Sequence, residues 1–457
     1  MTYRDRIAAA LEEGCRFAGL YANDNVVRTV LVATDGSLRL ESAAVENGSV
    51  ATIVDLTPAA AWDEREAADL YGVRFDGHEP LRPLVIHDLD LTSWTVRVRG
   101  DDAYQVAVGP IHAGVIESGH FRFHVVGDKI LHLDARLFYK HRGLERAAEG
   151  QTLADGRLYM QRACAACAVS NSLAYAHACE EILGLHPSAE LARVRTVLLE
   201  LERAWNHLND IAAVCAGAGL AAGNTFFAAL TERARRVNER FAGHRFLFNS
   251  VQLGGSALTL DAAAISATRE ELASIATASK RGWRELLFNS SFQDRLPDIG
   301  VVSADDARAL GAVGPAARAS GLADDARSRS TRLAYNGFEP VAPRRVVGDV
   351  QARLEQRAVE LLQTFALLDD LLDRPINPAE AVTARETTAV GLGLVESPRG
   401  ATLCAVEHAH HRVTRVHLRT GSYANWPVVA HAAAGNFLPD FPLINKSFEL
   451  CYACADR

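Results

Sequence analysis

Two pairs of cysteines constrain the fold of this chain more than any other feature of its sequence. Cys164 and Cys167 form one Cys-x-x-Cys pair, Cys451 and Cys454 form a second, and residues 168–450 separate them. Thiolate sulfur is the ligand that soft and borderline metals prefer, and two such pairs supply four ligands. If one metal site uses all four sulfurs, the fold must bring two distant segments together in its interior.

The two pairs are also compatible with different chemistry. Each fits a redox dithiol, half of a structural zinc site or chance, although zinc ribbons usually have a short spacer between their pairs. A helix is expected to start at Cys164 and Cys167. A helix N-terminus lowers the pKa of a thiol, which favours the thiolate that a metal needs. The pairs therefore predict a metal site but leave the metal open.

Composition limits the other classes of function. The chain has 457 residues, 49% of them hydrophobic, which is enough for a sizeable core and more than one domain. A net charge of −8 without a basic stripe argues against a nucleic-acid partner. The cysteines are too few and too dispersed for a disulfide scaffold, so we expect a cytoplasmic protein. No apolar run reaches the ~18–20 residues of a spanning helix, so membrane association is expected only through partner subunits.

The hydrophobic pattern divides the chain into two parts. Residues 1–85 predict a small α/β domain and residues 86–104 a linker. The elements expected in the small domain are a helix pattern over Ile7, Leu11 and Phe17, strands at Val26–Ala33 and Val50–Leu56, and an acidic helix at 61–70.

Residues 105–457 predict a larger domain. Alternating apolar residues at 105–150 indicate an antiparallel sheet, and 151–375 have helical periodicity, clearest from Ser188 to Cys215. Short strands are expected again at 388–420, and the last forty residues are expected to be irregular.

Glu117 and His120 place a carboxylate and an imidazole in one tight turn. That pairing suits proton transfer, and a role in stabilising the turn is equally compatible with it. His207 is expected on the polar side of its helix, beside Asn206.

Across nearly its whole length the sequence resembles a known family. It is similar to the large subunit of membrane-bound nickel–iron hydrogenases of the formate hydrogenlyase type, which are relatives of the fused C/D-type subunits of respiratory complex I. The segments that carry the resemblance are 63–72 with 77–82, 109–123, 139–145, 164–175, 202–207, 311–321, 396–400 and 440–448.

The resemblance implies an α+β fold. A complex I C-type, 30-kDa-like α/β domain at 1–85 would precede a mainly helical, hydrogenase large-subunit-like catalytic domain at 105–457. That domain would combine a bundle of long helices with small antiparallel sheets.

The resemblance also implies a nickel–iron centre whose iron carries carbonyl and cyanide ligands. Cys164 and Cys451 would be terminal nickel ligands, and Cys167 and Cys454 would bridge the two metals. Glu117 would carry protons to and from a terminal cysteine. Pro398 and Arg399 would lie over the metals, where the guanidinium can assist hydrogen cleavage. His120, Asn171 and Glu449 complete the residues expected around the centre.

The resemblance further implies partners. Electrons would leave through iron–sulfur clusters on a small subunit of the complex I B-type, because this chain has no further cysteine cluster. Membrane-arm subunits and a formate dehydrogenase or other electron-donor module would complete a complex on the inner face of the cell membrane.

The sequence departs from the family at two positions. Asn171 stands where the family usually has a histidine that supports the bridging sulfur, and Glu449-Leu450 replaces the usual Asp-Pro before the third cysteine. The chain ends at Arg457, near the point where many relatives are clipped, so we expect a mature form or one that needs no clipping. Two alternatives stay open: a complex I-like quinone or coupling subunit without hydrogenase activity, and a related scaffold with structural zinc.

Overall fold

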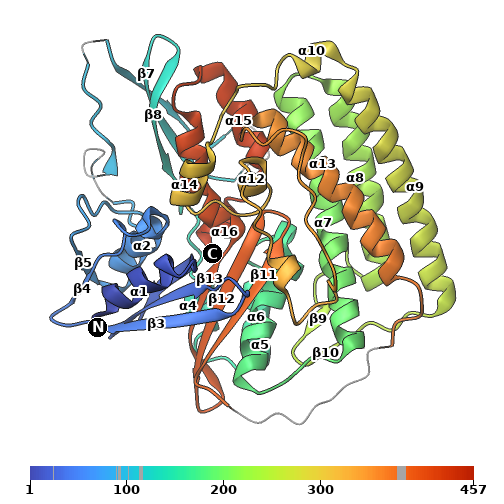
Figure 1. Ribbon diagram of the computed structural model, residues 1–457, viewed down its shortest axis with the longest axis horizontal. Coiled ribbons are helices and arrows are strands. Elements are labelled where there is room, and N and C mark those ends of the chain that lie inside the picture. Colours follow the sequence, from blue (N-terminus) through green and yellow to red (C-terminus); the bar gives the residue numbers. More distant parts are fainter. Residues whose placement is uncertain (24, 89, 91–93, 101, 113–116, 378–386) are drawn as a thin grey trace.

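The computed structural model describes residues 1–23, 25–88, 90, 94–100, 102–112, 117–377 and 387–457. A small N-terminal domain packs against the sheet of a larger, mainly helical domain (Figure 1). The predicted α+β class is therefore confirmed, while the boundaries at residues 85 and 104 stay a prediction. No helix among the described residues is both long and apolar enough to cross a membrane.

The N-terminal domain combines two small sheets with two α-helices. Its elements are α1 (Tyr3–Glu12), β1 (Arg16–Ala22), β2 (Val26–Val32), β3 (Leu38–Ala44), β4 (Ser49–Ala51), η1 (Pro58–Ala60), α2 (Ala61–Tyr71) and β5 (Arg74–Asp76). Strands β1, β2 and β3 form an antiparallel sheet, and β4 pairs with β5 in parallel. The strand expected at Val26 and the acidic helix are confirmed.

Two expectations for this domain are wrong. Phe17 lies in β1 and not in the first helix, because Gly14 adopts a left-handed φ of 89° that ends the helical run. The strand expected at Val50–Leu56 stops at Ala51. Beyond it, the backbone N–H of Ile53 and the hydroxyl of Thr52 donate to the buried carboxylate of Glu64, and these bonds replace strand pairing.

The larger domain contains two three-stranded antiparallel sheets. They consist of β6 (Tyr104–Val108), β7 (His120–Val126) and β8 (Lys129–Arg136), and of β11 (Val390–Ser397), β12 (Gly400–Ala409) and β13 (Arg412–Arg419). Both were expected from alternating apolar residues. A short hairpin, β9 (Val251–Gln252) with β10 (Gly255–Ser256), was not.

Long helices form a bundle beside the second sheet (Figure 1). The helices up to residue 371 are α4 (Leu144–Ala148), α5 (Leu153–Gln161), η2 (Ala165–Cys167), α6 (Ala168–Ile182), α7 (Ala189–Gly217), α8 (Ala221–Ala242), α9 (Ala262–Leu287), α10 (Ser290–Gln293), α11 (Ala304–Ala309), α12 (Gly314–Ala319), η3 (Ala326–Arg329) and α13 (Val350–Leu371). Helix α7 lies at the centre, capped as expected by Ser188, whose hydroxyl accepts from Leu191 N at 3.1 Å.

The last forty residues are helical, which corrects the expectation that they are irregular. They form α14 (Gly421–Ala433), η4 (Leu438–Asp440), α15 (Phe441–Phe448) and α16 (Ala453–Asp456). Pro442 stands in the first turn of α15, where a missing N–H costs no hydrogen bond. Helix α14 is buried almost all round, so it shows no apolar stripe in the sequence.

Buried ion pairs hold the two domains together. Arg457 donates to Glu66 of α2 at 2.7 Å and to Glu145 of α4 at 2.6 Å. Arg419 of β13 donates to Asp63 of α2 at 2.8 Å. The acidic helix of the N-terminal domain is thereby fixed to the segments on either side of the second cysteine pair.

Helix α6 lies so close to β11 that two glycines are required. A Cβ added to Gly391 or Gly393 would lie 2.0 Å from the carbonyl oxygen of Ala178 or Ala174, respectively.

We expect Gly393→Ala to lower the free energy of unfolding by about 1–3 kcal/mol, because the backbone of helix α6 cannot move aside without loss of packing. Urea unfolding would measure this loss. Ala389→Val, at an exposed position before the same strand, should change stability by less than about 0.5 kcal/mol and serves as control. Equal stability of the two variants would contradict the close approach.

Candidate metal centre

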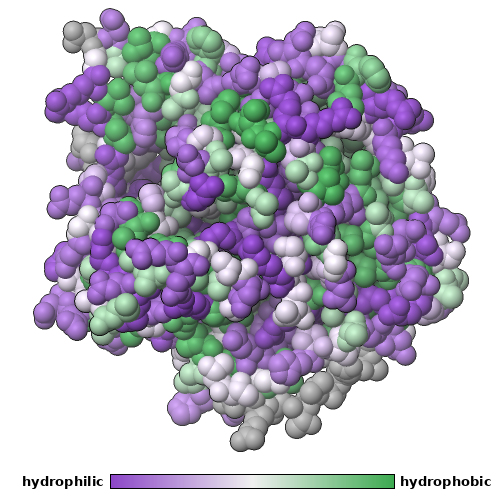
Figure 2. Space-filling view, in the orientation of Figure 1, coloured by the Kyte–Doolittle hydropathy of each residue, from purple (hydrophilic) through white to green (hydrophobic). Residues whose placement is uncertain are grey.

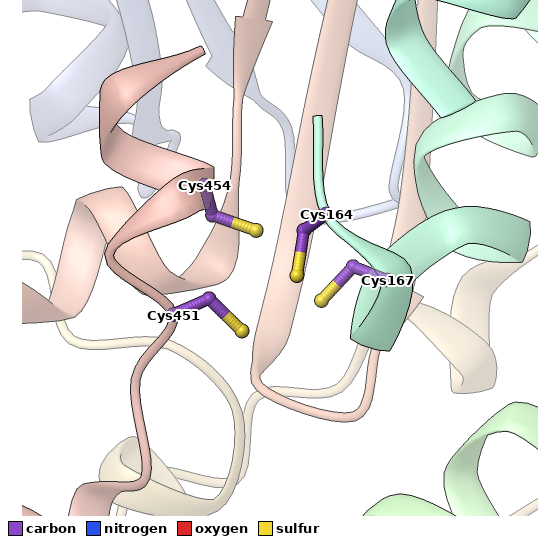
Figure 3. Close-up of side chains that lie close together, drawn as sticks. All are labelled: Cys164, Cys167, Cys451 and Cys454. Carbon is purple, nitrogen blue, oxygen red and sulfur yellow. The ribbon is translucent and has the colours of Figure 1, made fainter. Parts of the chain in front are cut away.

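The four predicted cysteines meet at one point. Cys164 and Cys167 lie in the turn that leads into α6, and Cys451 and Cys454 lie at the start of α16 (Figure 3). Their sulfurs are all within 4.8 Å of one another and point toward a common centre. Cys451 is partly exposed and the other three are buried. This arrangement offers a metal four sulfur ligands at bonding range.

The neighbouring sulfurs set the protonation of the site. Hydrogen bonds from Cys164 and the other two thiols lower the pKa of Cys451 well below its usual value. Hydrogen bonds to Cys164 and other thiols raise the pKa of Cys167 and of Cys454. The geometry therefore favours a thiolate at Cys451 before any metal binds. A metal would displace the remaining protons, so metal affinity should rise with pH.

Arg399 supplies a fixed positive charge beside the sulfurs. It lies with Pro398 in the buried turn between β11 and β12, and its Nε donates to the carbonyl oxygen of Glu449 at 2.7 Å. The guanidinium also donates to Asn206 Oδ1. Burial alone would lower the pKa of Arg399, but the negative charges of Cys451 and Asp210 raise it well above its usual value. The cation is thus held in place by groups on both sides of the cysteine cluster.

The two departures from the family pattern both lie at the site. Asn171 is completely buried one helical turn after Cys167, and neither polar atom of its side chain has a hydrogen-bond partner among the described residues. Glu449 has a left-handed φ of 49°, and burial and the charge of Asp210 raise its pKa to about 7. A buried amide without partners is costly. A group bound beside the sulfurs that accepts or donates a hydrogen bond would relieve the cost of burying the Asn171 amide. Asn171 therefore fits a site that holds a metal with ligands of its own.

Glu117 and His120 face different surroundings. Glu117 accepts a hydrogen bond from the backbone N–H of Ala453, between the two C-terminal cysteines, at 2.5 Å. The His120 ring packs edge-on against Trp94, and its Nδ1 lies 3.3 Å from the carbonyl oxygen of Gly109. The turn thus brings Glu117 to the site, whereas His120 packs against the linker. Residues 113–116, which precede Glu117, lie outside the described part of the chain.

Two families of known proteins match separate parts of the chain. The family described as respiratory-chain NADH dehydrogenase, 30 Kd subunit, matches residues 6–95, and the 49 Kd subunit family matches residues 219–390. The chain joins the two types in one polypeptide. It carries fused domains of the complex I 30 kDa and 49 kDa types and is related to complex I C/D subunits.

The fused subunit has relatives among hydrogenases. It is 29% identical over 442 residues to formate hydrogenlyase subunit 5 of Escherichia coli, covering 89% of this chain and 76% of the relative. It is 29% identical over 439 residues to hydrogenase-4 component G of Escherichia coli, covering 89% and 75%. A chain of the archaeal membrane-bound sulfane sulfur reductase has the same fold, with a TM-score of 0.70 and 25% identity over 78% of this chain and 99% of that chain.

Two residues of α7 position the first cysteine pair in this fused subunit, and neither was predicted to do so. The carboxylate of Glu202 accepts from the backbone N–H groups of Val169 at 2.6 Å and Ser170 at 3.1 Å. Asn206 donates to the carbonyl oxygen of Ala166 at 2.8 Å. Burial raises the pKa of Glu202 to about 7, against the effect of these bonds. The segment 202–207 carries the resemblance, but the sequence gives no sign of which backbone it holds.

A chain of buried charges continues from Arg399 into the bundle. Asp210 lies 3.4 Å from Arg399 and 3.1 Å from Arg357. His207 lies 3.8 Å from Asp210 and donates to Glu360 at 3.1 Å. His207 thus lies on a polar side of α7, and this side is buried, because α7 is covered on nearly all sides.

The chain of charges ends on Arg318. Its guanidinium lies 2.8 Å from both Glu360 and Glu396 and 3.2 Å from Asp325. Burial works to raise the pKa of Glu360, but Arg318 and the hydrogen bond from His207 hold it well below its usual range. These ion pairs fix the orientation of Arg399 from the interior of the bundle.

Proposed function

We propose that this chain is the catalytic large subunit of a membrane-associated nickel–iron hydrogenase that interconverts hydrogen with protons and electrons. The observation that carries the proposal is the set of four cysteine sulfurs within 4.8 Å of one another. The similarity to formate hydrogenlyase subunit 5 and hydrogenase-4 component G supports the choice of nickel and iron over zinc.

In this proposal each residue has a distinct role. Cys164, Cys167, Cys451 and Cys454 would hold the nickel–iron centre. The nickel–iron centre, when bound, supplies heterolytic cleavage and formation of hydrogen. Arg399 offers a fixed positive charge next to the cysteines. Glu117 takes up or delivers the proton at its carboxylate, close to the Cys451–Cys454 loop.

The same proposal places the chain in a larger assembly. Its iron–sulfur clusters would reside on a partner small subunit of the complex I B-type, with membrane-arm subunits and an electron-donor module completing the complex. The names of the relatives, a formate hydrogenlyase and an archaeal respiratory membrane complex, support this. Association with the inner face of the membrane would then be peripheral.

Metal analysis of the purified complex tests the proposal. Nickel and iron in near-equal amounts, with infrared bands from carbonyl and cyanide ligands, are expected. Zinc alone, or no metal, would refute it.

A second candidate is a complex I-like coupling subunit without hydrogenase activity. Asn171 favours this candidate, because it stands where hydrogenases have a histidine that supports the bridging sulfur. Stoichiometric nickel without hydrogen-dependent dye reduction would select it.

We expect Glu117→Gln to slow hydrogen-dependent dye reduction about 100-fold or more, since general acid–base groups typically contribute about 10²–10⁴-fold. Glutamine keeps an oxygen that accepts from Ala453 N, but it cannot carry a proton. Nickel content should stay unchanged, because Glu117 binds no metal in this proposal. Asp128→Asn, in the turn between β7 and β8, is the control and should keep full activity. Loss of nickel in Glu117→Gln would show that Glu117 is structural instead.

A further inference from the structure

A cavity of about 340 Å³ lies where the N-terminal domain meets the larger domain. Its walls come from β1, the turn between β2 and β3, α6, η3 and β11, so both domains contribute. In the space-filling view hydrophilic residues gather along this junction (Figure 2). The volume is within the range of small-ligand pockets, about 300–1,000 Å³. None of the four clustered cysteines lines the cavity.

Positive charge exceeds negative charge in this cavity. Arg16, Arg329 and Arg332 all line it, with side chains 42%, 33% and 27% exposed. Asp324 forms an ion pair with Arg16, and its carboxylate also lies 3.9 Å from the guanidinium of Arg329. Burial, with the nearby charge of Arg329, lowers the pKa of Arg16 to about 10. Arg16 therefore remains charged at neutral pH and is repelled by Arg329, and an anion bound between them would relieve this repulsion.

Three charged residues at the cavity have partners within the protein. Arg332 donates to the carbonyl oxygen of His177 at 3.1 Å and lies 3.8 Å from Glu180. Glu181 accepts from the backbone N–H of Leu392 at 2.7 Å. Arg419 pairs with Asp63. Guanidinium N–H groups of Arg16, Arg329 and Arg332 still have donors to spare, because each guanidinium carries five N–H bonds.

His177 gives a second, independent sign of a ligand. Its side chain lines the cavity and is only 2% exposed, yet its Nε2 has no hydrogen-bond partner among the described residues. A buried polar atom without a partner is unfavourable. Burial, together with the charges of Arg195 and Arg332, lowers the pKa of His177 well below its usual value. The neutral ring can therefore hydrogen-bond a ligand without adding charge.

Apolar side chains form another part of the cavity wall, beside Ser37, Ser330 and Thr331. Phe17, Leu38, Leu392 and Leu394 contribute side chains to the cavity. A bare inorganic ion would leave this surface facing water, whereas a ligand with an apolar part would cover it. We propose that the cavity binds a small organic anion, with a carboxylate or phosphate group held by Arg16, Arg329, Arg332 and His177 and an apolar body against β1 and β11.

Such a ligand would contact a segment that is tied to the buried charges of the bundle. Arg318 donates to the carbonyl oxygen of Asp324 at 2.9 Å, and the backbone N–H of Ala326 donates to Glu396 at 3.2 Å. The wall that carries Arg329 is thereby fixed before a ligand arrives. A preformed wall lowers the ordering cost of binding.

Isothermal titration of the full chain with phenyl phosphate, benzoate and benzyl alcohol tests the proposal. These probes share a ring and differ in their polar group. Whichever of phenyl phosphate and benzoate binds more tightly shows whether the site prefers a phosphate or a carboxylate. We expect saturable binding of at least one anion and at least tenfold weaker binding of benzyl alcohol. Inorganic phosphate should also bind at least tenfold more weakly than phenyl phosphate if phosphate is preferred.

Two variants locate the site. Arg329→Gln and Arg332→Gln should each weaken binding of the preferred anion about tenfold, because each removes a charge-assisted hydrogen bond. Arg308→Gln, an exposed arginine of α11 outside the cavity, should leave binding unchanged. Thermal unfolding would verify that each variant is folded. No saturable binding of either anion, equal binding of benzyl alcohol, or unchanged binding in both cavity variants would overturn the proposal.

Discussion

Cys451→Ser is expected to abolish nickel retention and hydrogen-dependent dye reduction in the purified complex. Hydrogen bonds from Cys164 and the other thiols stabilise the thiolate of Cys451 and lower its pKa. A serine hydroxyl of nearly the same size does not ionise at neutral pH and is a poor ligand for a metal that prefers sulfur. Mutating a residue that only hydrogen-bonds to a metal ligand typically lowers metal affinity or activity about 10–100-fold. Removing a metal ligand itself should therefore lower activity by more than about 100-fold.

Cys15→Ser provides the matched control. Cys15 is a buried free cysteine of the N-terminal domain and is not a member of the four-sulfur cluster. Its replacement should leave nickel content and dye reduction unchanged. Full activity in Cys451→Ser would refute the four-cysteine site. Equal loss in both variants would point to general damage from replacing a buried thiol.

The meeting of the two cysteine pairs was predictable from the sequence, because both pairs offer the same metal-binding chemistry. The helix at the second pair was not predicted, since the last forty residues were expected to be irregular. The residues around them were only partly predictable. Arg399 and Glu117 came from the family resemblance, and the structure brings both to the cluster. His120 was expected at the site with Glu117 because the two are close in sequence. Glu117 precedes β7 and contacts Ala453 N, whereas His120 begins β7 and packs against Trp94.

The buried charges could not be predicted from periodicity. Apolar residues at spacings of three and four marked one side of α7, and His207 and Asn206 marked a polar side without showing whether that side is buried. In the structure the helix is central, so that face is buried as well and carries Glu200, Arg203 and Asp210. Their partners lie far away in the sequence, such as Thr364 for Glu200 and Arg357 for Asp210. Only the tertiary fold decides which charges are paired.

Replacing one of these charges should have the largest effect on stability. Arg318→Met is expected to lower the free energy of unfolding by about 3–5 kcal/mol, as measured when one partner of a buried ion pair is removed. Methionine fills much of the volume but removes the cation that pairs with Glu396, and it leaves Glu360 and Asp325 to share Arg327, which lies 3.8 Å and 2.7 Å from them. Burial and the charge of Asp325 already raise the pKa of Glu396 with Arg318 present.

The pH dependence of that loss separates a charge effect from a packing effect. The pKa of Glu396 is already raised above its usual value with Arg318 present, and losing this cation should raise it further. Folding of the variant then favours the protonated form of Glu396, so the loss of stability should become smaller as pH falls through the raised pKa. The difference in unfolding free energy between wild type and Arg318→Met should therefore shrink between pH 7 and pH 5 in urea titrations. Arg308→Met removes only an exposed ion pair with Asp305 and should change stability by less than about 0.5 kcal/mol at both pH values. A difference that stays constant or widens on acidification would show that Arg318 acts through its volume and not through its charge.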